Sequence, residues 1–320
     1  AFFIFFVLTK INYRKLQILA PFLLLFSFLL LVYTRVQGCE GDSCRWLSIG
    51  PLSFQTSDLA RFSVIIFLAS YIDNNYKKMK SFFTGILVPL TAILPVALMI
   101  VIQPDNSTTM ILLAIVYAML FIGGASFIQL LTIGTISVGA FTIAILNKGN
   151  YALARILSFM NPASSENVSY QSSQALIGLK QGGISGMGIG ESIQKYSYLP
   201  ETHTDFIFAI IGEEMGFITG IILMIAYYII FYRSIQISKK SNDTFGILLS
   251  IGFGLSISIY ALINIGVVIG IVPVTGVPLP FISYGGSSLI TNLMMIAILL
   301  NISKAQRKIN VRKWRLRVDA

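Results

Sequence analysis

Charged side chains are scarce in this sequence. Of its 320 residues 11% are Asp, Glu, Lys or Arg and 55% are hydrophobic, whereas a soluble domain carries about 25% charged residues. Mean hydropathy is +0.80. So few charges cannot cover the surface of a soluble protein of this length, and the apolar runs reach the roughly 17–25 residues that cross a bilayer as a helix. The composition predicts an all-α, polytopic membrane protein.

Metal ligands and nucleotide-binding motifs are also lacking. His203 is the one histidine, and Cys39 and Cys44 are the two cysteines. A zinc site or an iron–sulfur cluster therefore lacks ligands. No G-x-x-x-x-G-K-[ST] loop occurs, which argues against direct ATP hydrolysis. We therefore predict no cofactor.

Apolar runs between polar breaks predict one partial helix and eight fuller membrane helices in a single domain that fills residues 1–320. The first run follows directly on Ala1, so we expect it to be the tail of a helix whose beginning is missing. The predicted helices cover residues 1–9, 16–33, 59–72, 84–103, 109–122, 127–146, 205–232, 245–269 and 287–302.

The Lys and Arg residues predict the orientation. Sixteen of the 23 lie on one side of the predicted membrane, in three loops and in the tail 303–320. Cytoplasmic loops carry such an excess, so this side is predicted to be cytoplasmic, with the basic tail beside anionic lipid of the inner leaflet. An orientation signal accounts for the tail without a partner site.

The long loops then lie on the outer side. They cover residues 35–57, about 147–204, and 270–286; long loops between packed helices are functional or disordered. Cys39 and Cys44 lie in the first, where they can form a local disulfide or remain reduced.

Ionisable residues at membrane depth are expensive and are candidates for function. Asp205 is the most informative, because it ends the longest outer loop and begins the helix that follows. It is either an anchor of the helix N-terminus or a carboxylate placed to accept a proton from a lipid-linked substrate. The other candidates are Asp58, Arg61, Asp105, Glu201, Glu213 and Glu214.

Glu213 lies about 80° around the helix from Asp205 and about 12 Å along it. That separation excludes a directly contacting pair, so a structural role inside the bundle is favoured for Glu213 and Glu214. His203 is either a proton shuttle or, by default, a hydrogen-bonding scaffold.

Two outer segments have unusual backbone requirements. Six glycines fall between Gly178 and Gly190, which lets the backbone bend sharply and approach a bulky substrate. Three prolines between Pro273 and Pro280 exclude regular helix, and irregular backbone near membrane depth is tolerated only where it is buried in protein or lines a cavity. Both segments are predicted to line an outward-facing cavity.

Two runs carry a family resemblance: YQSSQALIGLKQGGISGMGIGESIQKYSYLPETHTDFIFAIIGEEMG at 170–216 and NIGVVIGIVPVTGVPLPFISYGGSS at 264–288. They resemble the shape, elongation, division and sporulation (SEDS) glycosyltransferases, closer to the FtsW-type division branch than to the RodA type. Family members have ten spans in the bacterial cytoplasmic membrane and polymerise lipid II on its outer face. Weaker similarities occur at 45–61, 103–105 and 155–162.

The resemblance implies roles for individual residues. It places the essential acid of the family on Asp205 and a Pro-Glu motif on Pro200 and Glu201. An acid and a base of the fourth family span fall on Asp58 and Arg61, where the usual Glu and Lys are replaced; Arg is not equivalent to Lys. Our substrate-binding candidates are Arg61, Asp58, Lys195, Glu201, His203, Ser283, Gly285 and Gly286.

The implied reaction is an inverting glycosyl transfer from a polyprenyl pyrophosphate donor, with Asp205 as general base. Arg61 and Lys195 would stabilise the leaving group. A divalent cation is compatible with this chemistry, although no cluster of acidic residues requires one. The expected partner is a class B penicillin-binding transpeptidase. The alternatives are a lipid II flippase and a non-enzymatic division scaffold; the short cytoplasmic loops favour the one-sided enzyme.

Overall fold

The structure, a computed structural model, describes residues 1–37, 45–49, 52–148, 159, 166–197 and 203–318. The chain forms two compact units. The first contains Ala1–Thr132, Ile230–Ser256 and Gly286–Ala320, and the second contains Ile133–Ile229 and Ile257–Gly285. Helices α10 (Ile207–Lys240) and α11 (Thr244–Val268) belong partly to each unit. Helices dominate the fold, as the composition predicts.

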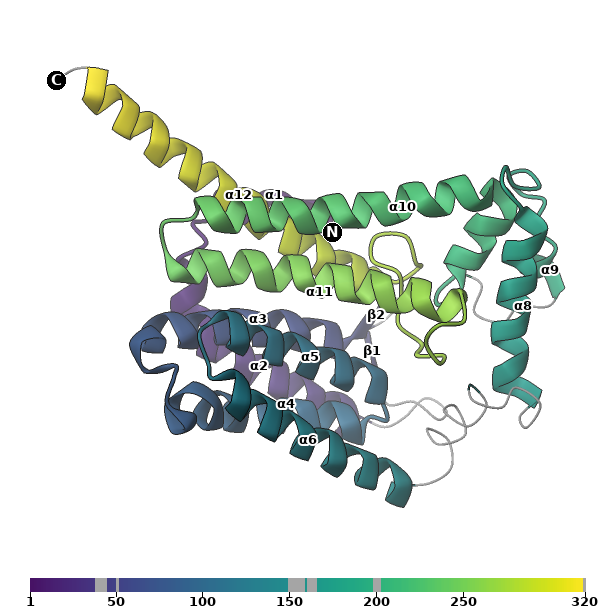
Figure 1. The fold of residues 1–320 in the computed structure, drawn as a ribbon, viewed down its shortest axis with the longest axis horizontal. Coiled ribbons are helices and arrows are strands. Elements are labelled where there is room, and N and C mark those ends of the chain that lie inside the picture. Colours follow the sequence, from purple (N-terminus) through teal and green to yellow (C-terminus); the bar gives the residue numbers. More distant parts are fainter. Residues whose placement is uncertain (38–44, 50–51, 149–158, 160–165, 198–202, 319–320) are drawn as a thin grey trace. The chain divides into compact units, whose positions relative to one another are not determined.

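The first unit is built around helix α3, Thr56–Asn75, which is buried along most of its length. Helices α2, α4, α5 and α12 all pack against it. Because α3 lies inside this bundle (Figure 1), its polar side chains near the N-terminal end are withdrawn from the surface. The helices of this unit are α1 (Phe2–Lys10), α2 (Lys15–Val36), α3, α4 (Val88–Ile102), α5 (Asn106–Ile122), the start of α6 (Phe127–Lys148) and α12 (Gly286–Val318).

Short elements complete the first unit. Strands β1 (Trp46–Ile49) and β2 (Leu52–Gln55) form an antiparallel hairpin directly before α3, with Trp46 opposite Gln55. A 3₁₀ turn, Tyr76–Lys78, and a π-helical turn, Phe83–Leu87, connect α3 to α4. The hairpin was not predicted, since two strands of four residues are too short to give a periodic signal.

Each predicted membrane helix coincides with a helix of the structure. Five helices in the described residues are long and apolar enough to span a membrane, and α5 and the first part of α6 are shorter apolar helices. The number of spans stays a prediction, as does the single-domain assignment of residues 1–320. Helix α12 continues to Val318, past the predicted end near 302, because a basic segment keeps its backbone hydrogen bonds in water as well as in lipid.

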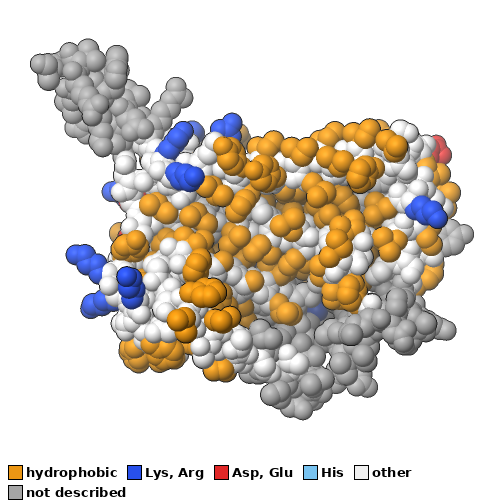
Figure 2. Space-filling model, in the orientation of Figure 1, with side chains coloured by type: hydrophobic (Ala, Val, Ile, Leu, Met, Phe, Trp, Pro, Cys, Tyr) orange, Lys and Arg blue, Asp and Glu red, His pale blue; other side chains and the backbone are white. Residues whose placement is uncertain are grey.

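The exposed side chains of these helices are largely hydrophobic. On α10 they include Phe217, Ile222 and Tyr228. Figure 2 shows hydrophobic side chains over most of the visible face, with few Lys and Arg side chains among them. A soluble protein does not expose contiguous apolar surface on this scale, so the described surface is that of an integral membrane protein.

The second unit contains the rest of α6, α8 (Glu166–Gly182), the short helix α9 (Gln194–Ser197), the first part of α10, the end of α11 and the non-helical segment that follows it. Helix α8 was not predicted, because it lies in a loop where polar and apolar residues are mixed. The proline-rich segment is non-helical from Gly270 to Gly285, as predicted.

Helix α10 is interrupted at Gly216, whereas the sequence predicted one continuous helix. Gly216 has φ of 77° and ψ of 177°. A Cβ there would lie 2.3 Å from the Ile184 carbonyl oxygen, so only glycine fits. The segment after α8 pairs with the interruption through hydrogen bonds from Met187 N to Glu213 O, 3.0 Å, and from Phe217 N to Gly183 O, 2.9 Å.

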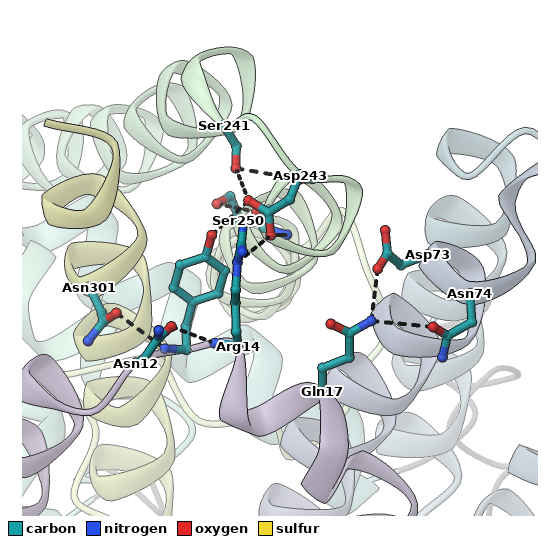
Figure 3. A network of polar contacts seen from close by, with 11 residues as sticks. Asn12, Arg14, Gln17, Asp73, Asn74, Ser241, Asp243, Ser250 and Asn301 are labelled. Carbon is teal, nitrogen blue, oxygen red and sulfur yellow. Dashed lines mark hydrogen bonds and ion pairs between the residues drawn. The ribbon is translucent and has the colours of Figure 1, made fainter. Parts of the chain in front are cut away.

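A polar network ties together the ends of the first unit's helices on the side where Lys and Arg are concentrated (Figure 3). Tyr13 donates its hydroxyl to Asp243 at 2.7 Å, and Arg14 pairs with the same carboxylate at 3.9 Å. Asn301 of α12 donates to the carbonyls of Thr9 and Ile11. Burial and the neighbouring Asp243 carboxylate raise the pKa of Tyr13 from 10.0 to about 12.

Candidate functional site

Asp205 lies in the turn directly before α10, with its side chain half-buried. Asn264, a buried residue of α11, fixes the backbone at this point. Its side-chain amide donates to the carbonyl of Asp205 at 2.8 Å and to the carbonyl of Val277 at 2.8 Å. One side chain therefore joins the Asp205 turn to the proline-rich segment.

The proline-rich segment makes two further bonds to the same turn. Ser283 donates its hydroxyl to the Thr204 carbonyl at 2.5 Å and accepts from Leu279 N at 2.7 Å. Tyr284 N donates to the His203 carbonyl at 2.8 Å. The carbonyls of residues 203, 204 and 205 are therefore each bound by a residue of α11 or of the proline-rich segment. These bonds fix the backbone that carries the Asp205 side chain.

Gly276 lies beside the Asp205 carboxylate. A Cβ built on Gly276 would lie 3.4 Å from Asp205 Oδ2, and the residue has φ of +69°. This positive φ is accessible to glycine without strain. The absence of a side chain at this position keeps one approach to the carboxylate open.

A second cluster surrounds Glu213, which is fully buried in α10. Its carboxylate accepts from Ser192 Oγ at 2.5 Å, and from Ile193 N at 3.0 Å and Gln194 N at 3.4 Å. Ser192 Oγ in turn accepts from Lys195 N at 3.1 Å. These bonds give Glu213 the structural role that was favoured from the sequence, and they fix the backbone that carries Lys195.

Asp58 and Arg61 form a buried pair near the start of α3 in the first unit. Arg61 Nη2 lies 3.4 Å from Asp58 Oδ1 and 3.4 Å from the amide oxygen of Asn292 on α12. Ser288 accepts from the Asn292 amide nitrogen at 3.2 Å. Arg61 has no exposed surface and Asp58 very little. Because two such charges are costly to bury, the surrounding structure must compensate them.

Asp105 joins the hairpin to α5 in the same unit. It accepts from Thr108 N at 3.3 Å at the start of α5. Gln55 and Ser57 donate to its other oxygen at 3.3 and 3.5 Å, and Arg45 lies 3.9 Å away. These contacts are those of a helix N-cap that organises neighbouring loops.

The remaining predicted residues are placed as follows. Within the second unit, His203, Asp205 and Ser283 come together, while Lys195 belongs to the Glu213 cluster. Gly286 begins α12, and a Cβ there would meet nothing within 4 Å. Glu201, Pro200, Cys39 and Cys44 lie outside the described residues. The substrate-binding roles of all these residues stay predictions.

Sequence reasoning missed Asn264, Gly276 and Ser192. Asn264 carries a usable signal, since it is a polar residue inside an otherwise apolar helix. The other two carry none, because glycine and serine are common in loops. In the described part of the chain no three His, Cys, Asp or Glu side chains are arranged to hold a metal ion; the prediction of no cofactor stays a prediction.

The exposed surface of the helices is apolar, and the half-buried Asp205 lies in a turn at the start of a helix. These features are those of an integral membrane protein with a polar site at the end of a helix. The family model of the FtsW, RodA and SpoVE cell cycle proteins matches residues 1–308. The chain belongs to this family.

Curated relatives support the same assignment. Stage V sporulation protein E of Bacillus subtilis is 36% identical over 306 residues, covering 94% of this chain and 83% of the relative. A probable peptidoglycan glycosyltransferase FtsW of Halothiobacillus neapolitanus is 39% identical over 294 residues, covering 90% of this chain and 70% of the relative.

Solved structures are similar in fold. A chain from a peptidoglycan synthase complex that coordinates polymerization and crosslinking matches with a TM-score of 0.75 at 27% identity, covering 95% of this chain and 86% of that one. The rod shape determining protein RodA of Thermus thermophilus matches with a TM-score of 0.68 at 26% identity, covering 95% and 84%.

Proposed function

We propose that this protein is a peptidoglycan glycosyltransferase that polymerises lipid II into glycan strands on the outer face of the cytoplasmic membrane. The observation that carries the proposal is the geometry at Asp205. Its backbone is held by Asn264, the adjacent Thr204 by Ser283, and its carboxylate faces Gly276, which has no side chain. Support also comes from relatives that are named probable peptidoglycan glycosyltransferases.

Asp205 acts as the general base. It accepts the proton of the acceptor sugar's 4-hydroxyl while that oxygen bonds to the anomeric carbon of the donor. The bond from that carbon to the pyrophosphate oxygen breaks, and polyprenyl pyrophosphate leaves with the bonding electrons. Displacement in one step inverts the anomeric centre. A general base acts best from a defined position, and the bonds to the carbonyls of residues 203–205 fix the backbone from which the Asp205 carboxylate extends.

Lys195 supplies positive charge toward the departing pyrophosphate. Its backbone is fixed through Ser192 to the buried Glu213, so the point from which the Lys195 side chain extends is defined within the second unit. Stabilisation of developing negative charge by a prearranged cation is a large contribution in reactions of this type. No nucleotide is required, since the donor carries its own leaving group.

We further propose that the protein acts in cell division together with a class B penicillin-binding transpeptidase. The FtsW names of the relatives support the division role. The similarity to a chain from a complex that coordinates polymerization and crosslinking supports a crosslinking partner.

The test uses the purified protein, lipid II and a gel that resolves glycan polymer, with and without the transpeptidase. Asp205→Asn is expected to reduce polymer formation by about 10²–10⁴-fold, the usual contribution of a general base. Asp73→Asn is the matched control, because Asp73 belongs to the first unit, where it accepts a hydrogen bond from Gln17. Equal polymer from Asp205→Asn and wild type would exclude Asp205 as the base. No polymer from wild type with the transpeptidase present would overturn the proposed activity.

A further inference from the structure

Residues 183–193, which we call the glycine loop, expose apolar side chains. The exposed fractions are 72% for Ile184, 42% for Met187 and 82% for Ile189. Exposing large aliphatic side chains to water costs about 25 cal/mol for each Å². Three such residues within six positions are unfavourable in a loop that is surrounded by water. We therefore expect an apolar environment around residues 184–189, the tip of the loop.

The glycine loop has a defined position on α10. Met187 N and Gly188 N donate to the Glu213 and Glu214 carbonyls, both at 3.0 Å, and Phe217 N donates to Gly183 O. The Glu213 carboxylate holds the other end of the loop through Ser192 Oγ. Because these bonds join the loop to the interruption of the helix, the tip lies next to the segment around Gly216.

That part of α10 is itself apolar on its exposed side. Met215, Phe217 and Ile218 are exposed, and so are Ile221 and Ile222 further along the helix. Helix α10 is one of the candidate membrane spans. The tip therefore continues the lipid-facing surface of α10. Contact with lipid would explain why both the tip and this part of the helix expose apolar side chains.

The length of α10 sets the depth of the tip. About 20 residues at about 1.5 Å each cross the roughly 30 Å of hydrocarbon. The uninterrupted part of α10, from Phe217 to Arg233, the first charged residue toward the basic end, covers about 24 Å of this thickness. The interruption at Gly216 therefore lies near the far edge of the hydrocarbon. The glycine loop is attached at this level, which places its tip at the boundary between hydrocarbon and headgroups.

Helix α8, directly before the glycine loop, fits the same boundary. It exposes Leu176 and Ile177 together with the polar Lys180 and Gln181. In Figure 1 it runs across the direction of α10. A helix that crosses the direction of α10 and exposes both apolar and polar side chains suits the interfacial region of a bilayer, where lipid and water are both present.

We propose that the glycine loop inserts Ile184, Met187 and Ile189 into the outer leaflet, where phospholipid acyl chains surround them. The insertion holds the loop, and with it Ser192 and Lys195, at the membrane surface. It goes beyond the proposed catalytic function, because it concerns only where the loop lies and holds whether or not the protein polymerises lipid II.

The test measures the depth of spin labels on the full chain in phospholipid nanodiscs. Cys39→Ser/Cys44→Ser is the background, and Ile184→Cys and Ile189→Cys are labelled one at a time with a nitroxide. Collision with oxygen reports lipid, and collision with a water-soluble nickel chelate reports water. Ile222→Cys, on the lipid-facing side of α10, and Asn242→Cys, exposed in the turn before α11, are the two references.

The oxygen-to-nickel ratio at 184 and 189 is expected to be severalfold above that at Asn242→Cys and to approach that at Ile222→Cys. Ratios equal to that at Asn242→Cys at both positions would overturn the insertion. A second measurement avoids the label: Ile189→Trp, in a Trp46→Phe/Trp314→Phe background, should be quenched by phospholipids brominated near the headgroup end of the acyl chain. An unquenched tryptophan contradicts the proposal.

Discussion

The carboxylate of Glu213 accepts a 2.5 Å hydrogen bond from the hydroxyl of Ser192, twenty-one residues earlier in the chain. The same carboxylate accepts two backbone N–H groups, from Ile193 and Gln194. Three donors converge on one buried acid, so this acid determines where the residues before Lys195 lie. Hydrogen bonds to a charged acceptor contribute more than neutral ones, and losing them would release the loop.

Glu213→Ala is therefore expected to loosen the backbone from 192 to 195. Hydrogen–deuterium exchange of the Ile193 and Gln194 amides should accelerate by roughly 10- to 100-fold, as expected from bonds of about 1.5–3 kcal/mol to a charged group. Polymer formation should fall with it. Glu214→Ala is the matched control, since its buried oxygen Oε1 has no hydrogen-bond donor in the described residues. Unchanged exchange at 193 and 194 would show that Glu213 does not hold the loop.

Gly276→Ala tests the open approach to Asp205. The new methyl group would contact Asp205 Oδ2 at 3.4 Å and would sit on a residue with φ of +69°. The positive φ costs alanine about 1–2 kcal/mol of folding free energy. Apart from this loss of stability, the methyl group beside the carboxylate is expected to reduce polymer formation about tenfold, which corresponds to about 1.4 kcal/mol of activation free energy. Gly124→Ala separates the two effects, because Gly124 has φ of +94° and open space around its Cβ. Equal polymer formation by the two variants at equal stability would contradict the role of Gly276.

The Asp58–Arg61 pair can be divided into structural and functional contributions. Arg61→Leu leaves a buried carboxylate without its cation and is expected to destabilise the protein by about 3–5 kcal/mol. Asp58→Leu/Arg61→Leu removes both charges and should recover most of that stability. We expect the double variant to stay inactive, as the family resemblance implies. Thermal unfolding and polymer formation are measured on the same preparations; activity that returns with stability would make the pair purely structural.

The raised pKa of Tyr13 predicts that the protein loses stability at alkaline pH. The pKa of Tyr13 is raised to about 12 by burial and by Asp243, so the folded state favours the protonated phenol. This contribution is fully present below pH 10 and is lost as pH rises from 10 to 12. The stability difference between wild type and Tyr13→Phe, about 1 kcal/mol at neutral pH, should shrink over this range. Thermal unfolding at a series of pH values measures it, with the exposed Tyr76→Phe as the control; a difference independent of pH would contradict the assignment.

Several features could be predicted because they depend on neighbouring residues alone. Apolar runs gave the places of the membrane helices, since the length of an apolar segment is enough to make it prefer lipid. Three prolines excluded helix between Gly270 and Gly285, and the family runs singled out Asp205. Charge counted along the chain predicted which ends of the helices are basic, where Tyr13, Arg14 and Asp243 now meet.

The hydrogen bonds and contacts between these segments could be seen only in the tertiary structure. Asn264 reaches Asp205 across 59 positions, and Ser283 reaches Thr204 across 79. The glycine loop packs against Gly216, where α10 is interrupted. Hydrophobicity is a property of a segment and can be read locally, whereas a hydrogen bond needs a partner whose distance along the chain is not fixed by sequence. The scarcity of charge placed the protein in a membrane, and the contacts between distant segments determined how the few buried carboxylates are held.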